Sequence, residues 1–168
     1  MRPRIAVALL AIGCGGSAPP PATSVYEAYD YTPEFGARFT YVEPGVTTGG
    51  TQLHMLVGNG SWDLRTGDDF DSGTDFASWP TSVDNEIGLV VDGTILLPAG
   101  FEEGDDFDTG TIEFIGKTEV VIGTYAEAIT ARIDEGPLAG EAIFVVGTGP
   151  VALTIDGTRW EASVVEKP

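Results

Sequence analysis

Glycine and proline interrupt this chain so often that no segment keeps a helical period for long. The 168 residues include 23 Gly and 11 Pro, and the stretches between them are short. Within 51–57, the hydrophobic residues Leu53, Met55 and Val57 recur at every second position. Such alternation is typical of a strand that buries one face. The chain is therefore expected to be an all-β protein.

Two Asp-Gly pairs predict tight hairpins inside this pattern. Asp92-Gly93 separates two apolar arms within 88–97, and Asp156-Gly157 does the same within 149–160. Asp-Gly favours the positive φ angles of a type I′ turn, which joins neighbouring antiparallel strands. The other strand candidates are 37–42, 61–65, 111–115, 118–122, 125–133 and 141–146, and a short helical turn is expected within 25–31. About 9–10 short strands with hairpin connections predict a single antiparallel curved sheet, a barrel or a sandwich.

The first 25 residues have a different composition, which predicts a signal and a tether. Arg2 and Arg4 precede an apolar run over 5–12 and then Cys14, the only cysteine. That run is too short to span a bilayer, which takes about 20 residues, so 1–13 is interpreted as a lipoprotein signal peptide that leaves Cys14 as the acylated residue. Residues 14–25 are rich in Gly, Ser and Pro, as in a flexible tether, and the all-β domain is expected over 26–168. This start resembles that of known lipoproteins, and the resemblance implies that Gly15, in place of Asp after the cysteine, favours the bacterial outer membrane, with the domain expected to face the periplasm or the cell surface.

The charge of the chain is strongly negative. The formal net charge is −18, and it becomes −20 without Arg2 and Arg4. Such a field repels the phosphates of nucleic acids and anionic lipid headgroups, and it attracts cations. Nucleic acid is therefore excluded as a partner. With Cys14 bearing a lipid, the predicted mature chain has no thiol left for a disulfide or for nucleophilic catalysis.

An acidic sequence occurs twice and is the main candidate for a metal site. The first acidic segment, Gly67–Thr74, returns as the second acidic segment, Gly104–Thr111, with Thr109 in place of Ser72. Alternating carboxylates on a turning loop can converge on calcium. The candidate calcium ligands are Asp69, Asp71, Asp75, Asp106 and Asp108. Neither copy has the closing glutamate of an EF-hand loop, so the alternative is a pair of solvated turns.

No catalytic residue is assigned, and the protein is predicted not to be an enzyme. The run from Glu102 to Asp108 could supply paired carboxylates for a hydrolase, but a segment so charged and glycine-rich is expected to lie in water. His54 is the only histidine, and the chain has no Gly-x-Ser-x-Gly motif, so His54 is interpreted as an ordinary strand residue. The three tryptophans are expected in the core, with a role in binding a sugar or a lipid as the alternative.

Four motifs resemble a family of secreted and lipid-anchored bacterial β-domains of unknown function. The family begins with Tyr-x-Pro-x-x-Gly-x-x-aromatic-x-Tyr, which matches Tyr31 to Tyr41 here. The other matching segments are 96–100 with 104–107, then 121–129, and then 145–151, where Pro150 replaces a small or apolar residue. The resemblance implies a curved antiparallel sheet, similar in shape to the lipoprotein carrier LolA, whose concave face can hold an apolar partner. It implies no catalytic residues.

These observations predict a lipid-anchored cell-envelope protein that acts as a non-catalytic binding or structural module. Its predicted partners are a membrane, through the lipid on Cys14, and an apolar or protein ligand on the concave face of the sheet. Two alternatives stay open. One is a calcium-stabilised surface or adhesion module that uses both acidic segments, with calcium as the only candidate cofactor. The other is a carboxylate-based hydrolase.

Overall fold

The computed structural model describes residues 25–46 and 50–168, and over these ranges the chain is almost entirely β-structure. The predicted signal peptide, Cys14 and nearly all of the predicted tether lie outside the described residues. The elements are β1 (Tyr26–Glu27), η1 (Ala28–Tyr31), β2 (Arg38–Val42), β3 (Gln52–Val57), β4 (Ser61–Gly67), β5 (Thr74–Asp84), β6 (Gly88–Val91), β7 (Thr94–Pro98), β8 (Gly100–Phe101), β9 (Asp106–Phe107), β10 (Gly110–Val120), β11 (Gly123–Ile133), β12 (Gly140–Val145), β13 (Gly149–Ile155) and β14 (Thr158–Glu166).

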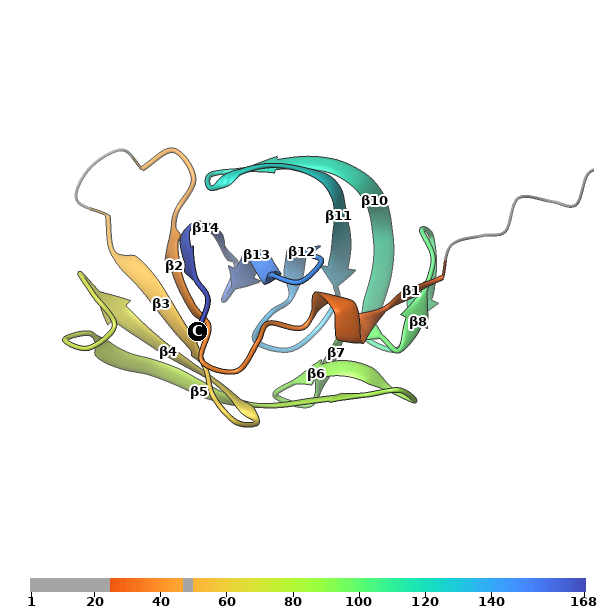
Figure 1. Cartoon of the computed structure of the whole chain (residues 1–168), viewed down its shortest axis with the longest axis horizontal. Helices are drawn as coiled ribbons and strands as arrows, with labels where there is room; N and C mark the ends of the chain where they lie inside the picture. The colour runs from red at the N-terminus through yellow and green to blue at the C-terminus, as the bar shows by residue number, and fades with distance from the viewer. Residues whose placement is uncertain (1–24, 47–49) are drawn as a thin grey trace, which may run out of the picture.

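Twelve of the described strands form one antiparallel sheet, which confirms the predicted class. Their order is β7-β6-β5-β4-β3-β2-β14-β13-β12-β11-β10-β9, while β1 pairs with β8. Each neighbour in the large sheet is also a neighbour in the chain, except that β14 lies beside β2. The sheet curves until its two ends approach each other, and it forms a nearly closed, barrel-like structure (Figure 1). At this seam the Thr109 hydroxyl donates a hydrogen bond to the Ile95 carbonyl at 2.5 Å.

Alternation along the strands fills the inside of the curved sheet with large side chains. In β2 and β3, Phe39, Tyr41, Leu53 and Met55 are at most 1% exposed. The rings of Phe39 and Tyr41 stack with their centroids 5.8 Å apart. Such side chains on every strand of the curve provide the hydrophobic burial that holds the sheet together.

The tryptophans belong largely to this packing, as expected. Trp62 on β4 lies opposite Trp79 on β5, and they are 1% and 7% exposed. Trp160 is partly buried and packs against the same core. The core interpretation therefore accounts for all three.

Both predicted hairpin turns are confirmed. Asp92 and Asp156 each have φ of 49°, and the glycines that follow have φ of 79° and 78°. Two successive positive φ angles are characteristic of a type I′ turn. The turns join β6 to β7 and β13 to β14.

The predicted elements differ from the structure in three places. The described residues contain fourteen strands, and the long β5 was not predicted. Residues 111–115 and 118–122, predicted as separate strands, belong to the single strand β10 and the turn after it, with irregular pairing on either side of Gly116. The expected helical turn within 25–31 is the 3₁₀ helix η1 preceded by β1.

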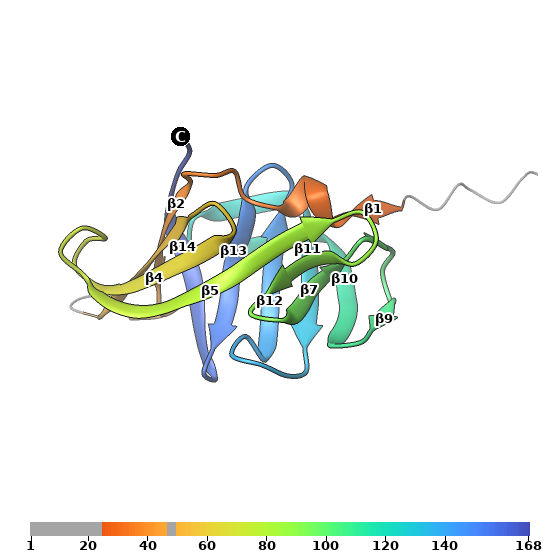
Figure 2. The same cartoon turned by 90° about the horizontal axis from the view of Figure 1, so that it is seen from below.

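The segment from Val25 to Ala37 lies across one end of the barrel-like sheet (Figures 1 and 2). Hydrogen bonds fix it there: the Ala28 amide donates to the Ala99 carbonyl, the Gly147 amide to Asp30, and the Gly36 amide to Val57. In the part of the chain that the structure describes, no helix is both long and apolar enough to cross a membrane.

Candidate functional site

The two acidic segments, nearly identical in sequence, have different structures and lie apart. The first acidic segment contains the loop between β4 and β5, whereas the second acidic segment includes β9 and the start of β10. In the second, Phe107 pairs with Gly110, so Asp108 and Thr109 form a two-residue turn. Both cartoon views place the two segments at opposite ends of the long axis of the molecule (Figures 1 and 2).

The candidate calcium ligands are not brought together. Asp69 accepts a hydrogen bond from the Ser72 amide at 2.7 Å, Asp75 pairs with Arg65 at 2.8 Å, and Asp106 accepts from the Thr111 hydroxyl at 2.8 Å. Within residues 25–46 and 50–168, no group of three or more His, Cys, Asp or Glu side chains is arranged to hold a metal ion. Asp71 and Asp108 are exposed, on different segments. Calcium binding therefore stays a prediction without a common site in the described structure.

The carboxylates of the second acidic segment stabilise local turns and an edge of the sheet. Asp105 accepts a hydrogen bond from the Glu102 amide, and Glu103 accepts one from the Ile115 amide, both at 2.8 Å. Ile115 belongs to β10, whose pairing with β9 covers only Gly110 and Thr111. The Glu103 carboxylate thus supplies an acceptor at a strand edge that has no neighbouring strand there.

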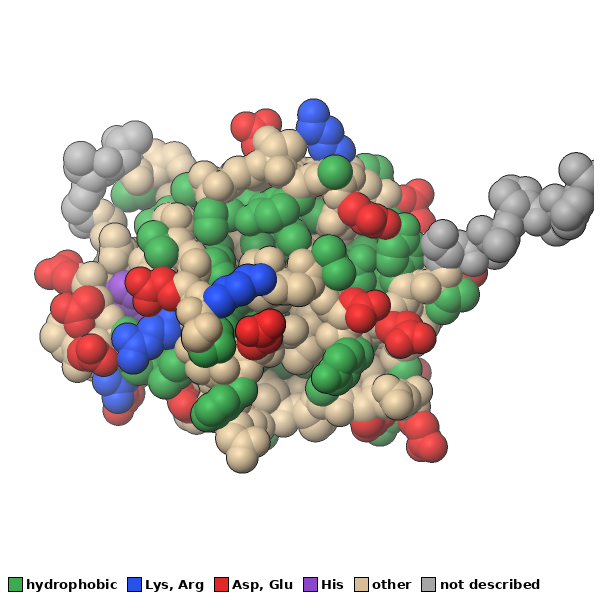
Figure 3. All heavy atoms as spheres, viewed as in Figure 1, with side chains coloured by type: hydrophobic (Ala, Val, Ile, Leu, Met, Phe, Trp, Pro, Cys, Tyr) green, Lys and Arg blue, Asp and Glu red, His purple; other side chains and the backbone are tan. Residues whose placement is uncertain are grey.

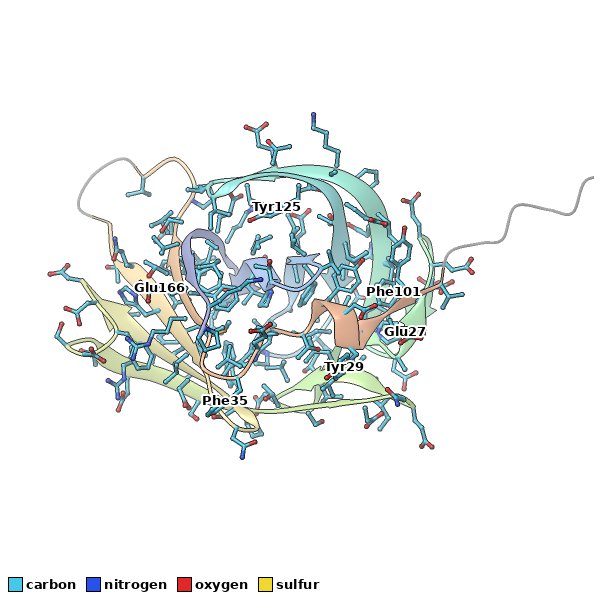
Figure 4. The ribbon with its side chains drawn as sticks, viewed as in Figure 1. Glu27, Tyr29, Phe35, Phe101, Tyr125 and Glu166 are labelled. Atoms are coloured by element: carbon cyan, nitrogen blue, oxygen red, sulfur yellow. The ribbon has the colours of Figure 1, made fainter. Side chains whose placement is uncertain are left out.

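The first acidic segment has a different role, because it forms one wall of a groove. This groove, which we call the loop groove, has a volume of about 730 Å³. Its other walls come from β2, β3 and β14. The loop groove is lined by Arg38, Phe39, Thr40, Gln52, His54, Met55, Asp68, Asp69, Phe70, Asp71, Ser72, Ser163, Val164 and Glu166. Figure 4 shows Glu166 beside β2 and β14, on the side of the molecule from which β4 and β5 extend.

Phe70 fixes the first acidic segment over the sheet. The guanidinium carbon of Arg65 lies 4.8 Å from the centre of the Phe70 ring, and that of Arg38 lies 5.6 Å from it. Arg65 also donates a hydrogen bond to the Phe70 carbonyl at 3.1 Å and pairs with Asp75 at 2.8 Å. Cation–π contacts at exposed sites contribute about 0.5–1 kcal/mol each. These contacts fix the loop in position as one wall of the groove.

His54 lies on the floor of the loop groove and is only 5% exposed. Its Nε2 atom is 3.2 Å from the Gly67 carbonyl oxygen, and its Nδ1 atom is 3.2 Å from the Thr40 hydroxyl. A carbonyl oxygen only accepts, so Nε2 carries a hydrogen and donates it to Gly67, while Nδ1 forms its hydrogen bond with the Thr40 hydroxyl. Both ring nitrogens are therefore engaged within the protein. This arrangement ties β2, β3 and the start of the first acidic segment together.

The remaining wall depends on an irregularity between β14 and β2. The pairing shifts between Ala162 and Val164, so Ser163 is an additional residue in β14. The Ser163 hydroxyl donates a hydrogen bond to the Thr40 carbonyl at 3.1 Å. Such a bulge redirects the side chains of its strand. Ser163, Val164 and Glu166 all line the groove as a result.

The electrostatics of the loop groove are dominated by carboxylates. Asp68, Asp69, Asp71 and Glu166 line the groove together with Arg38, and all five residues are exposed. The hydrogen bonds that Ser72 donates lower the pKa of the Asp69 carboxyl and favour its charged form. The groove is therefore a net negative surface with neutral hydrogen-bonding groups at Thr40, Gln52, Ser72 and Ser163.

Sequence reasoning singled out the acidic segments and His54 but missed Arg38, Arg65, Phe70 and Glu166. The sequence shows an aromatic residue within each acidic segment. It does not show that Phe70 contacts two cationic side chains, because these come from β2 and β4. Arg65 and Asp75 are opposite each other across β4 and β5. A prediction of β5 would have revealed that pair.

Comparison with known proteins adds no relative: no family model matches the chain, and no curated protein or solved structure is similar to it. The protein is therefore classified by its fold and its groove alone. It is an all-β protein with a nearly closed twelve-stranded antiparallel sheet and an acidic groove on the outer side of that sheet.

Proposed function

We propose that this protein is a non-catalytic binding module of the bacterial cell envelope, held at a membrane by a lipid on Cys14, and that it binds a positively charged ligand in the loop groove. The loop groove is the single observation that carries the binding proposal. It is large enough for a small organic molecule or a short peptide segment. Its carboxylates face one arginine, and the whole chain has a net charge of −18, which attracts cations over long distances.

The loop groove is a better candidate for the binding site than the concave face of the sheet, where the sequence resemblance predicted an apolar partner. The concave side of β2, β3 and β4 is occupied by the protein's own side chains, including Phe39, Leu53, Met55 and Leu64, at most 1% exposed. A ligand there would have to displace a close-packed core. The loop groove, by contrast, is already open to solvent and is bounded by fixed walls.

Spermidine is a suitable probe of the binding proposal. We expect it to bind the wild-type protein in isothermal titration calorimetry, and we expect a double variant, Asp71→Asn with Glu166→Gln, to bind about tenfold more weakly. Both side chains are exposed, so the substitutions should leave the fold intact. Raising the salt concentration should weaken binding to the wild-type protein, because salt screens exposed charges.

The matched control is Asp108→Asn with Glu119→Gln, which removes two negative charges outside the groove. Asp108 occupies the position in the second acidic segment that Asp71 occupies in the first. The control should retain nearly wild-type affinity. Equal losses in the two double variants would show that spermidine responds only to the total charge, and the groove would then be rejected as the binding site.

The anchor is tested separately by Cys14→Ser. We expect the wild-type protein to stay in the membrane fraction of bacterial cells after a carbonate wash, which removes peripherally docked proteins, and the Cys14→Ser protein to be released into the soluble fraction, because the variant has no thiol for acylation. Ser17→Ala, a nearby substitution that keeps Cys14, is the control and should stay with the membrane. Membrane association of Cys14→Ser equal to wild type would contradict the anchor.

A further inference from the structure

Two aromatic side chains protrude from the end of the barrel-like sheet that the segment from Val25 to Ala37 covers. Tyr29 is 68% exposed and Phe35 is 70% exposed, more than any other large hydrophobic side chain in the described ranges. Both line a hollow of about 490 Å³ together with Thr32, Pro33 and Gly147. Figure 4 shows both residues on the face of the molecule that is turned towards the viewer.

Other hydrophobic groups accompany these rings. Val25, in the same segment, is 64% exposed, and Val146, next to Gly147, is 53% exposed. We call Val25, Tyr29, Phe35 and Val146 the end face. Figure 3 also shows hydrophobic side chains gathered in a recess beneath the arch of β10 and β11, where Figure 4 places Tyr125. The arch therefore adds apolar surface next to the end face.

The exposed rings stand on a base that is fixed by its buried neighbours. Ala28 and Tyr31 on η1 are 1% and 3% exposed, and Ala37 is 2% exposed. The Thr32 hydroxyl donates a hydrogen bond to the Ala28 carbonyl at 3.1 Å. The rings are thus exposed on an ordered segment, and their exposure is not a consequence of a loose chain end. Rigid presentation lowers the entropy lost when such a surface binds.

We propose that the end face docks onto the surface of a lipid bilayer of zwitterionic headgroups. The length of the chain between Cys14 and the end face supports a bilayer as the binding partner. This argument rests on the proposed lipid anchor. Ten residues lie between Cys14 and Val25, and the eleven steps from one to the other, at about 3.5 Å each, span at most about 40 Å. A connection of that length gives an effective concentration of the order of millimolar, so even weak docking becomes appreciable.

The chemistry of the end face selects the type of headgroup. Tyr and Phe side chains partition favourably into the interface between headgroups and acyl chains. Asp30 and Glu34 line the same hollow as the two rings, a single lysine, Lys167, donates a hydrogen bond to the Gly147 carbonyl there, and the whole chain is strongly acidic. Anionic lipids would therefore repel this face. Apolar insertion into a zwitterionic surface meets no such repulsion.

Vesicle flotation of the full chain carrying Cys14→Ser tests the docking without a lipid anchor. We expect this protein to float with phosphatidylcholine vesicles, and to float less with vesicles that also contain phosphatidylglycerol. Adding Tyr29→Ser and Phe35→Ser should reduce the bound fraction on phosphatidylcholine at least about fivefold, because two interfacial side chains are lost. The matched control adds Phe76→Ser and Phe114→Ser, which replace phenylalanines that are 46% and 44% exposed on β5 and β10.

The apolar run over 5–12 is present in all three proteins, so a difference between the two double variants reports on the end face itself. Equal flotation of both double variants, or stronger flotation with phosphatidylglycerol, would overturn the proposal. A dimer of the Cys14→Ser protein that Tyr29→Ser and Phe35→Ser dissociate in sedimentation would also overturn it, in favour of a second copy of the chain. Failure of the anchor is recognised separately, by the cell fractionation of Cys14→Ser described above.

Discussion

Replacing Gly88 by alanine is expected to lower the free energy of unfolding by at least about 3 kcal/mol. Gly88 begins β6 with φ of +107°, a conformation that L-residues rarely adopt. A Cβ atom there would lie 2.1 Å from the Leu97 carbonyl oxygen and 2.6 Å from the Ala99 nitrogen. These are backbone atoms of β7 and of the residue after it, so relief requires the sheet itself to move.

Gly93→Ala is the matched control, because it separates the backbone conformation from the collision. Gly93 has φ of +79°, and an added Cβ atom would have no neighbour within 4 Å. This variant should lose about 1–2 kcal/mol, the cost of the left-handed conformation alone. Urea unfolding of both variants measures the difference. Equal losses would show that the close approach of β6 to β7 contributes nothing beyond backbone strain.

Local signals predicted much of the fold correctly. The strand β3 and the two Asp-Gly hairpins follow from alternation and turn chemistry within a few residues. The strand β5 could not be found in this way, because only Trp79 among its eleven residues is buried and Pro80 interrupts it. It is a strand because Thr74–Pro80 pair with β4 and Thr81–Asp84 pair with β6. Those partners are properties of the folded chain.

The candidate site was less predictable, and the two acidic segments show why. Phe70 and Phe107 occupy equivalent positions in nearly identical sequences. Phe70 makes cation–π contacts with Arg38 and Arg65, whereas Phe107 packs against the hydrophobic core beside a two-residue turn. The neighbouring strands decide between these structures. A repeat within the sequence therefore identified similar composition but not a similar role.

The order of the sheet also depends on contacts between distant segments. β2 lies beside β14, more than a hundred residues away in sequence. Buried tyrosines fix this region: Tyr41 is fully buried, and its hydroxyl donates a hydrogen bond to the Pro150 carbonyl at 2.7 Å. Tyr31 is 3% exposed and lies in the segment that covers one end of the sheet. Alternation predicts that such residues face inwards, but it does not predict what they contact.

These two tyrosines lead to an expected loss of stability at alkaline pH. Burial raises the pKa of Tyr31 from 10.0 to about 12, with a further contribution from the negative charge of Glu127, and burial raises the pKa of Tyr41 well above 10.0. The unfolded chain therefore releases these protons at a lower pH than the folded protein does. The contribution of Tyr31 to stability is complete below pH 10 and is lost as the pH rises from 10 to about 12, and the contribution of Tyr41 also begins to fall at pH 10.

Urea unfolding at several pH values between 9 and 12 measures this loss, and absorbance of the phenolate follows the ionisation. In the Tyr31→Phe variant, the free energy of unfolding should fall less steeply with pH. The slope should decrease by the equivalent of up to one proton, because the variant no longer has that group to ionise. Tyr41→Phe should do the same, and at neutral pH it should also cost about 1–3 kcal/mol, because the Pro150 carbonyl loses its buried donor. A decline as steep in both variants as in the wild-type protein would show that groups other than these buried phenols govern alkaline unfolding.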